Sequence, residues 1–344
     1  MIRLLPNLLA VMTLRLDRTD LGQVRFAFSP LWETVMSLRT LGSANDQAHR
    51  PWIAGATRRL AASTVDLPLL TALVRPAGYL PDFLVPSPRT GRPRFRTALE
   101  QVAASPPEDV AEQLTILTEH DLVADRPWRD ERIHLLRRLA EEPAAAIGRI
   151  VAELDAYWKI AIEPVWPRVE PMLQADLAYR LEQLSTKGLG HLLRSLHPIV
   201  SFDGDAIRVE KYWDERVDLG GRGLLLVPCV FAWPDVIVQT VEPHTPTLSY
   251  SPRGMALLWT TSSLRDRTAL ADVLGRTRAL LLAALDLPMS TTQLSDQLEL
   301  APPTVNAHLK ALTNAGILAA RRDGRTVLYA RSPLGDALLG GADT

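Results

Sequence analysis

The sequence predicts an α+β protein that is predominantly helical, with a large N-terminal region and a small C-terminal unit. Three observations predict this fold class. The chain has 344 residues, 47% hydrophobic and 22% charged, which is long for one domain and sufficient for a buried core. Helical patterns dominate up to about residue 187, and β-rich runs follow from residue 198. Near the end stand two short helical patterns and a hairpin signal.

Short strands and then a helix are expected at the start of the N-terminal region. Residues 13–28 alternate as short strands would. Ser29 then supplies an N-cap hydroxyl, and Pro30 occupies the first helical position of LWETVMSLRTL. The preceding apolar stretch lacks the cleavage site of a secretory signal, so we expect an ordered arm or a true start at Met12. Further helices are separated by Pro-rich loops, among them GYLPDFLVPSPRTGRPRF.

Prolines interrupt the helical stretch over residues 143–187. Pro164, Pro167 and Pro171 each remove an amide donor, which predicts two helices with a kinked junction. Beyond Pro198, IVSFDGDAIRVEKYW, GLLLVP, VIVQT and TLSY predict the strands of a small antiparallel sheet. The longest apolar run, GLLLVPCVFAWPDVIV, is broken by prolines and an aspartate, so it predicts buried strands and no membrane span.

Charge and cysteine count narrow the class of protein. The chain has a net charge of −1, so it is no polycation as a whole. Between residues 275 and 331, however, seven Lys/Arg face four Asp/Glu, which leaves +3 on that segment. Cys229 is the single cysteine, so no internal disulfide can form, and we expect a cytoplasmic location.

The C-terminal unit predicts helix, helix-turn-helix and hairpin in that order. A helical pattern over residues 274–285 is followed by Ser290 and Gln293, which have the spacing of a capping box. The chain turns at residues 300–302, and a second helix is expected over 302–314. At about 100° per residue, one face of this helix carries inward-pointing Val305, Leu309 and Leu312.

The opposite face of that second helix is small and polar. Thr304, Ala307 and Lys310 are expected to point outward, with Asn306 and His308 on the flanks. Such a face fits the major groove of DNA, where side chains contact base edges. The alternative for the unit is a role in protein contacts or dimerisation only, and the alternative for His308 is a half-buried packing histidine.

A basic hairpin is expected to follow. Asp323-Gly324 between β-rich arms predicts a two-residue turn. Arg321, Arg322 and Arg325 cluster near its tip, where they could contact phosphates.

Residues 275–331 resemble the ArsR-type winged helix-turn-helix of bacterial repressors, through LGRTRALLL, STTQLSDQL, PPTVNAHLKALTNAGIL and RRDGRTVLYA. Ala301 and Pro303 stand where that family usually has serines, so a capping hydroxyl is lost. The thiolate motif of its metal-sensing members is absent. The resemblance implies a regulator that binds double-stranded DNA, and the expected contacts are Thr304, Asn306, Ala307, His308, Lys310, Arg322 and Arg325.

The N-terminal region resembles an uncharacterised domain fused ahead of such winged helices in regulators from high-GC bacteria. VRFAFSPLWETVMSLRTL and GRGLLLVPCVFAWP carry this resemblance, and the excess of arginine over lysine agrees with such a source. It implies no known chemistry. We expect residues 1–262 to form a domain that dimerises, senses a ligand, or does both, and residues 263–344 to form the winged helix-turn-helix.

Other chemistry finds little support in the sequence. His191 and His197 have no carboxylate or cysteine at ligand spacing, so no metal site is expected. The glycines of residues 220–223 precede a strand, which argues against a phosphate-binding loop. Cys229 is expected to be a small buried hydrophobe. The aromatic residues Tyr157, Trp158, Trp166 and Tyr179 are either core or the lining of a pocket for an organic effector.

Together these features favour a dimeric transcriptional repressor that reads a pseudo-palindromic operator, because one short helix reads few base pairs. The expected signal is an organic ligand or none at all, metal sensing is not expected, and no cofactor is expected. A purely structural DNA-binding protein without a ligand is one alternative, and an enzyme with a catalytic N-terminal domain and an accessory winged helix is another. Its discriminating feature would be converging acid, base or nucleophile residues, and the sequence shows none at a recognisable spacing.

Overall fold

The structure is a computed structural model that describes residues 10–43, 48–120, 129–211, 214–255, 258–259, 270–285, 288–298, 300–323 and 326–340. The chain divides into two compact units. The larger unit comprises Leu16–Leu177 and Asp218–Ser251, and the smaller unit comprises Met1–Arg15, Ala178–Val217 and Pro252–Thr344. The domain boundary expected near residues 260–264 lies outside the described residues, so a division at residue 262 stays a prediction.

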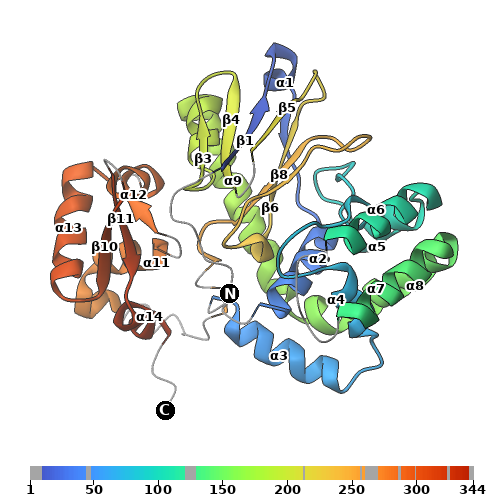
Figure 1. Ribbon diagram of the computed structural model, residues 1–344. Coiled ribbons are helices and arrows are strands. Elements are labelled where there is room, and N and C mark those ends of the chain that lie inside the picture. Colours follow the sequence, from blue (N-terminus) through green and yellow to red (C-terminus); the bar gives the residue numbers. More distant parts are fainter. Residues whose placement is uncertain are drawn as a thin grey trace. The chain divides into compact units, whose positions relative to one another are not determined.

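Helices make up most of the larger unit, and Figure 1 shows α4 to α8 gathered as one group. Ser29 accepts a hydrogen bond from the Trp32 amide at 3.3 Å, which confirms the predicted N-cap of α2. The short helix α1 was not expected, because residues 13–28 alternate like strands. Asp17 and Asp20 cap it reciprocally. The bounds are α1 (Arg18–Gly22), α2 (Pro30–Leu41), α3 (Arg50–Ala61), α4 (Leu67–Leu73), α5 (Phe95–Ala103), α6 (Pro107–His120), α7 (Arg129–Glu141) and α8 (Pro143–Tyr157).

A mixed four-stranded sheet lies in the larger unit, in the order β2-β6-β8-β7. Its strands are β2 (Val24–Phe26), β6 (Leu224–Pro228), β7 (Ile237–Gln239) and β8 (Thr247–Tyr250). β2, β6 and β8 run parallel, and β7 pairs antiparallel with β8. The fold class is therefore confirmed, but this sheet is not antiparallel. Every residue of β6 is buried, as is typical of a parallel strand covered on both faces.

The expected antiparallel sheet is a second one, with the order β3-β4-β1-β5. It contains β1 (Ala10–Arg15), β3 (Val200–Phe202), β4 (Ala206–Lys211) and β5 (Glu215–Asp218). β4 pairs antiparallel with both β1 and β3. The predicted glycine turn between β3 and β4 is present, with Gly204 at a φ of 115°. Met12 is buried in the middle of β1, at 3% exposure.

The predicted kinked junction joins α8 to α9 (Trp166–Arg194). A π-helical turn (Trp158–Ile162) and a 3-10 turn (Glu163–Val165) lie between them. Pro164 has no amide hydrogen, so it cannot donate to the carbonyl of Ile160 as a helical residue would. Arg59 of α3 replaces that donor, with its Nε 2.8 Å from the Ile160 oxygen. A side chain from another helix therefore stabilises the kink.

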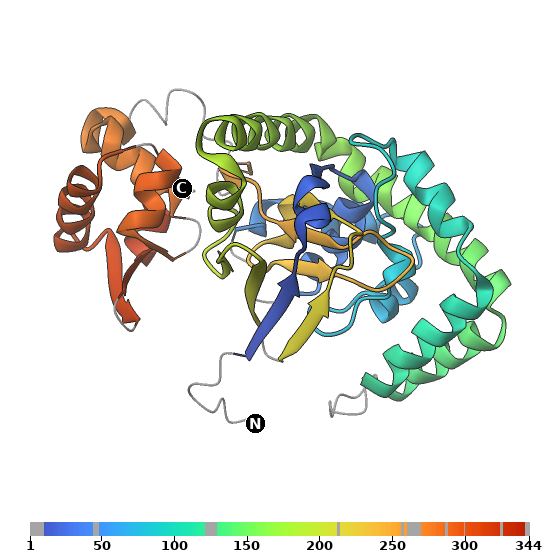
Figure 2. The ribbon, with the colours of Figure 1, turned by 90° about the horizontal axis from the view of Figure 1, so that it is seen from above.

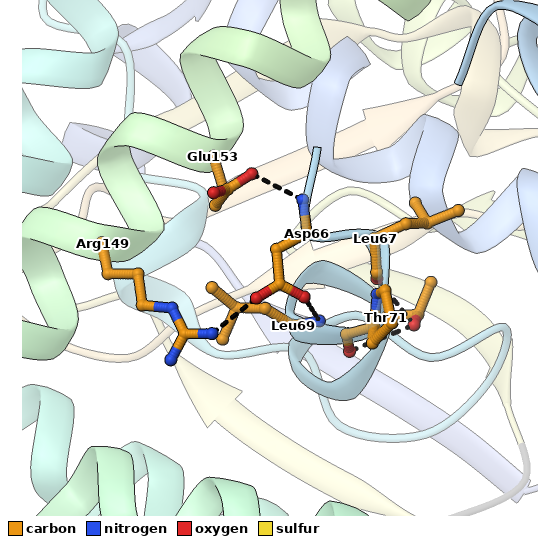
Figure 3. A network of polar contacts seen from close by, with 7 residues as sticks. Asp66, Leu67, Leu69, Thr71, Arg149 and Glu153 are labelled. Carbon is orange, nitrogen blue, oxygen red and sulfur yellow. Dashed lines mark hydrogen bonds and ion pairs between the residues drawn. The ribbon is translucent and has the colours of Figure 1, made fainter. Parts of the chain in front are cut away.

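Figure 3 shows how α4 is fixed to α8. The Asp66 carboxylate accepts from the Leu69 amide at 3.0 Å, so it caps α4. The same carboxylate accepts from Arg149 at 2.5 Å, and Glu153 accepts from the Asp66 amide at 2.8 Å. Burial pushes the pKa of Asp66 upward, but the hydrogen bonds from Leu69 and Arg149 outweigh it and hold that pKa below its usual value.

The core of the larger unit is centred on α2, which is buried along nearly its whole length. Glu33, in its first turn, is 0% exposed. Its carboxylate accepts from the Val230 amide at 2.7 Å, the Phe231 amide at 3.2 Å and the Cys229 thiol at 3.3 Å. Val230 and Phe231 lie in the 3-10 turn (Val230–Ala232) that follows β6, and Cys229 is its N-cap residue. A single acidic side chain thus joins the central helix to the sheet.

Candidate nucleic-acid interface

The C-terminal elements form a small, mainly helical body with a separate hydrophobic core. Its elements are α11 (Arg276–Ala284), β9 (Met289–Ser290), α12 (Thr291–Leu298), α13 (Pro302–Asn314), β10 (Leu318–Asp323), β11 (Thr326–Arg331) and α14 (Pro333–Gly340). Leucines dominate the buried cluster that these elements share. Leu281, Leu282, Leu294, Val305, Leu309 and Leu312 are each at most 2% exposed.

The start of α12 follows the predicted capping box. The backbone amide of Gln293 donates to the Ser290 hydroxyl at 3.2 Å. The backbone amide of Ser290 donates to the side-chain oxygen of Gln293 at 2.8 Å. Ser290 also belongs to β9, which pairs with β11 opposite Leu328. This two-residue strand was not predicted. It ties the start of α12 to the hairpin and completes a three-stranded sheet in the order β10-β11-β9.

A tight turn separates α12 from α13. The Leu300 amide donates to the Ser295 carbonyl at 3.1 Å, and α13 starts at Pro302, as predicted. Ala301 occupies the N-cap position and makes no side-chain capping bond. The expected loss of a capping hydroxyl is therefore confirmed, and the proline in the first turn partly compensates for it.

The two faces of α13 differ as the helical spacing predicts. Val305, Leu309 and Leu312 are buried. Thr304, Ala307 and Lys310 are exposed, and they lie along one side of the helix. Asn306 and His308 are half-buried on the flanks. The structure thus presents a small, polar outward face with a single cation, and no bulky apolar group interrupts it.

The hairpin β10–β11 projects from the helices, as Figure 2 shows. Its register pairs Asp323 with Thr326. Residue 324 lies outside the described residues, so the predicted Asp323-Gly324 turn stays a prediction. Arg321 and Arg322 on β10 are exposed. Arg325, expected as a phosphate contact, lies outside the described residues. Buried Tyr329 holds the hairpin to the helices.

The last helix closes the body against the base of the hairpin. Arg331 forms an ion pair with Asp336 at 2.7 Å and donates to the Leu282 carbonyl at 3.2 Å. Gly335 approaches Ile317, the residue before β10, so closely that an added Cβ would lie 2.4 Å from its carbonyl oxygen. A glycine is therefore required here by packing.

The four aromatic residues suggested for a ligand pocket do not have one common environment. Tyr157 is fully buried, and its hydroxyl lies 2.9 Å from the Ser37 hydroxyl. Trp158 lies 5.3 Å from Trp166 between ring centroids. Tyr179, further along α9, lies under the Arg253 guanidinium at 3.5 Å. Trp158 and Trp166 form one cluster, while Tyr157 is a core residue.

Cys229 is buried, as predicted, but it is not surrounded only by hydrophobic groups. Its thiol donates a hydrogen bond to the Glu33 carboxylate. Burial, and to a lesser extent the charge of Glu33, raises the pKa of the thiol. A thiol held in its protonated form is a poor nucleophile and a poor metal ligand. Within the described residues no group of three His, Cys, Asp or Glu side chains could hold a metal ion.

The glycine turn of residues 220–223 also has a structural role. The Gly223 amide donates to the Asp20 carboxylate at 2.9 Å, so an acidic side chain occupies the position where a phosphate-binding loop would hold its ligand. The sequence did not predict that Glu33 is buried and accepts three hydrogen bonds. An acid in the first turn of a helix is an ordinary surface feature, and no local pattern indicated its burial.

The helices α11 to α14, a three-stranded sheet and an exposed polar helix face beside a basic hairpin define the C-terminal body as a winged helix, a class of DNA-binding unit. Residues 277–320 match the family described as bacterial regulatory protein, arsR family. The chain therefore carries an ArsR-type helix-turn-helix, the DNA-binding element of a transcription regulator.

The region ahead of it matches a second family. Residues 97–255 match a family of unknown function (DUF5937), in agreement with the predicted pairing of an uncharacterised domain with a winged helix. No curated protein and no solved structure matches the chain. None of the helices in the described segments is both long and apolar enough to span a bilayer.

Proposed function

We propose that this regulator is a repressor whose α13 enters the major groove of its operator. The observation that carries the proposal is the outward face of α13, where Thr304, Ala307 and Lys310 are exposed and Asn306 and His308 flank them. Ala307 is small enough to contact a thymine methyl group, and the polar side chains can bond to base edges. Lys310, Arg322 and Arg325 supply contacts to phosphates, which position the helix.

We further propose that the regulator acts as a homodimer. One helix of this length reads only a few base pairs, so specificity requires two half-sites. Leu280 on α11 and Leu334 and Leu338 on α14 are 48%, 50% and 37% exposed. These two helices contact each other, so their exposed leucines offer an apolar surface that a second copy can cover.

The proposed signal is an organic molecule bound by the N-terminal region. Two aromatic contacts support an apolar site there, because Trp158 stacks on Phe95 at 4.4 Å and lies 5.3 Å from the half-buried Trp166. Soft-metal sensing needs accessible thiolates, but the single cysteine is buried and donates a hydrogen bond to Glu33. Thiophilic ions are therefore expected to leave operator binding unchanged in the wild type and in Cys229→Ser. Release by an ion in both proteins would contradict this proposal.

Selection of bound duplexes from a randomised DNA pool tests the proposed function. The expected consensus is an inverted repeat whose half-sites lie about one helical turn, roughly 10 base pairs, apart. Recovery of a single half-site would contradict the homodimer but not the groove contact. A pool that shows no enrichment over its starting composition would contradict sequence-specific recognition.

A further inference from the structure

A second basic surface lies in the larger unit, far along the chain from the winged helix. The segment over residues 87–96, SPRTGRPRFR, joins a 3-10 turn (Asp82–Leu84) to α5 and is called the basic loop below. It contains four arginines and no acidic residue. All four are exposed, and so is Arg25 on the edge strand β2. The loop arginines are Arg89, Arg92, Arg94 and Arg96.

The backbone of the basic loop is fixed at several points. Trp32 donates its Nε1 to the Pro86 carbonyl at 3.2 Å, just ahead of the loop, and Ser87 donates to the Thr245 carbonyl at 3.0 Å. In the middle, the Phe28 amide donates to the Gly91 carbonyl at 3.1 Å. This bond sets the loop beside the end of β2. The loop therefore presents its arginines from a held backbone, which lowers the entropy cost of binding.

The charges of the basic loop are not neutralised within the part of the chain that the structure describes. None of its arginines forms an ion pair there. Arg92 lies over the Phe28 ring at 5.3 Å. Asp82, the nearest acid before the loop, is buried and accepts from Gln239 at 3.0 Å. Glu100, the nearest acid after it, is exposed one turn beyond Arg96 on α5. Four cations thus face solvent in a chain whose net charge is −1.

We propose that the basic loop binds the phosphate backbone of DNA that flanks the operator. This inference rests on the proposed function, because the same chain must already be held on the duplex. A guanidinium donates two parallel hydrogen bonds to a phosphate, so arginine suits this partner better than lysine. A duplex carries one negative charge per about 1.7 Å of its axis, and seven residues of extended chain span up to about 23 Å. Several phosphates therefore lie within reach of one loop.

The experiment uses the full chain and the selected operator in two duplexes, one limited to the operator and one extended by flanking DNA. The test variant is Arg89→Gln/Arg94→Gln/Arg96→Gln. It keeps Arg92 and its contact with Phe28, so the loop backbone should hold. The control is Arg137→Gln/Arg138→Gln, which removes two exposed arginines from α7, so the losses are compared per arginine removed. Circular dichroism melting checks that each variant is folded. Affinity is measured by fluorescence anisotropy over a series of salt concentrations.

The expected result is a weaker salt dependence of the test variant on the long duplex. Each lost phosphate contact removes about 0.9 from the slope of log K against log salt, so three contacts remove up to about 2.7. On the short duplex the variant should match the wild type. Equal slopes for the variant and wild type on the long duplex would overturn the proposal, as would an equal loss in the α7 control.

Other outcomes separate this proposal from its alternatives. An unchanged DNA slope together with lost binding to phosphatidylserine vesicles would assign the loop to a lipid surface and overturn the DNA assignment. Failure of the proposed function has its own signature. In that case the wild type would show no preference for the selected operator over mixed-sequence DNA, whatever the loop variant does.

Discussion

Glu33 makes the stability of the larger unit depend on pH in a direction opposite to that of most carboxylates. Burial raises its pKa from 4.5 to about 7, against the hydrogen bonds donated by Val230, Phe231 and Cys229. The neighbouring His49 gives no counter-charge, because burial lowers its pKa to about 3. Between pH 4.5 and 7 the folded chain therefore holds a proton on Glu33 that the unfolded chain has released, so the contribution of Glu33 to stability falls as pH rises. His49, buried in its neutral form, contributes in the opposite direction, and it does so equally in the wild type and in a Glu33 variant.

The size of this effect follows from the shift. At about 1.4 kcal/mol per pKa unit, a rise from 4.5 to about 7 corresponds to about 3 kcal/mol of stability, present below pH 4.5 and lost by pH 7. Glu33→Gln abolishes this titration. It also leaves at least one of the three donors without an acceptor, which costs about 1–3 kcal/mol at every pH. The wild type should thus be the more stable protein at low pH, and its advantage should shrink by about 3 kcal/mol towards pH 7.

Urea unfolding followed by tryptophan fluorescence measures this difference. All eight tryptophans precede residue 260, so the signal does not come from the winged helix. Glu100→Gln, at an exposed position of α5, controls for the loss of one negative charge. A difference between wild type and Glu33→Gln that stays constant from pH 4.5 to 7 would refute the reasoning. It would mean that the three hydrogen bonds keep the carboxylate ionised throughout.

Two further predictions concern packing and capping. Gly335→Ala should destabilise the winged helix by about 1–3 kcal/mol, because the added Cβ would lie 2.4 Å from the Ile317 oxygen. Hydrogen exchange of the amides in α14 and β10 measures this loss. Protection equal to that of the wild type would refute the prediction. Gly148→Ala in α8, whose Cβ meets nothing within 4 Å, is the control, and it should raise stability by up to about 1 kcal/mol because alanine favours the helix. Asp66→Ala should lower the free energy of unfolding by about 1 kcal/mol, because the cap of α4 is lost. Asp66→Asn should lower it less, because asparagine still caps α4 and the lost ion pair with Arg149 is half exposed. Equal losses for the two variants in urea unfolding would refute the capping role.

The winged helix could be predicted because its determinants are local. The Ser290 and Gln293 pair, the turn before Pro302 and the spacing of Val305 and Leu309 all lie within a few residues of the structure they specify. β9 was missed because two residues carry no periodicity, and they form a strand only through their pairing with β11. The Asp-Gly signal indicated the hairpin, but it does not fix the strand register, in which Asp323 pairs with Thr326.

The larger unit was less predictable because its determinants are distant in sequence. β2 pairs with β6 through Val24 and Leu224, and no local pattern indicates a partner so far away. The unbroken apolar run of β6 was the available signal for a parallel strand. Glu33 is buried because residues 229–231 supply its donors, again from far along the chain.

Spacing along a helix also says little about which aromatic residues meet. Tyr157 and Trp158 are adjacent in sequence, yet one bonds to Ser37 and the other stacks on Phe95. The π-helical turn that begins at Trp158 changes the periodicity at this point. A grouping of the aromatic residues by sequence alone could not separate the core residue from the cluster.

The central claim is that the outward face of α13 contacts DNA, and operator affinity of Ala307→Glu tests it most directly. Ala307 is exposed, so the substitution leaves the buried face of the helix intact, while it places a carboxylate against phosphates and base edges. The matched control is Ala54→Glu, the same substitution at an exposed position of α3. Gel-shift titration of the selected operator should show a loss of about 100-fold or more for Ala307→Glu, since like-charge contacts cost several kcal/mol, and no loss for the control. Wild-type affinity in a folded Ala307→Glu protein would contradict the account.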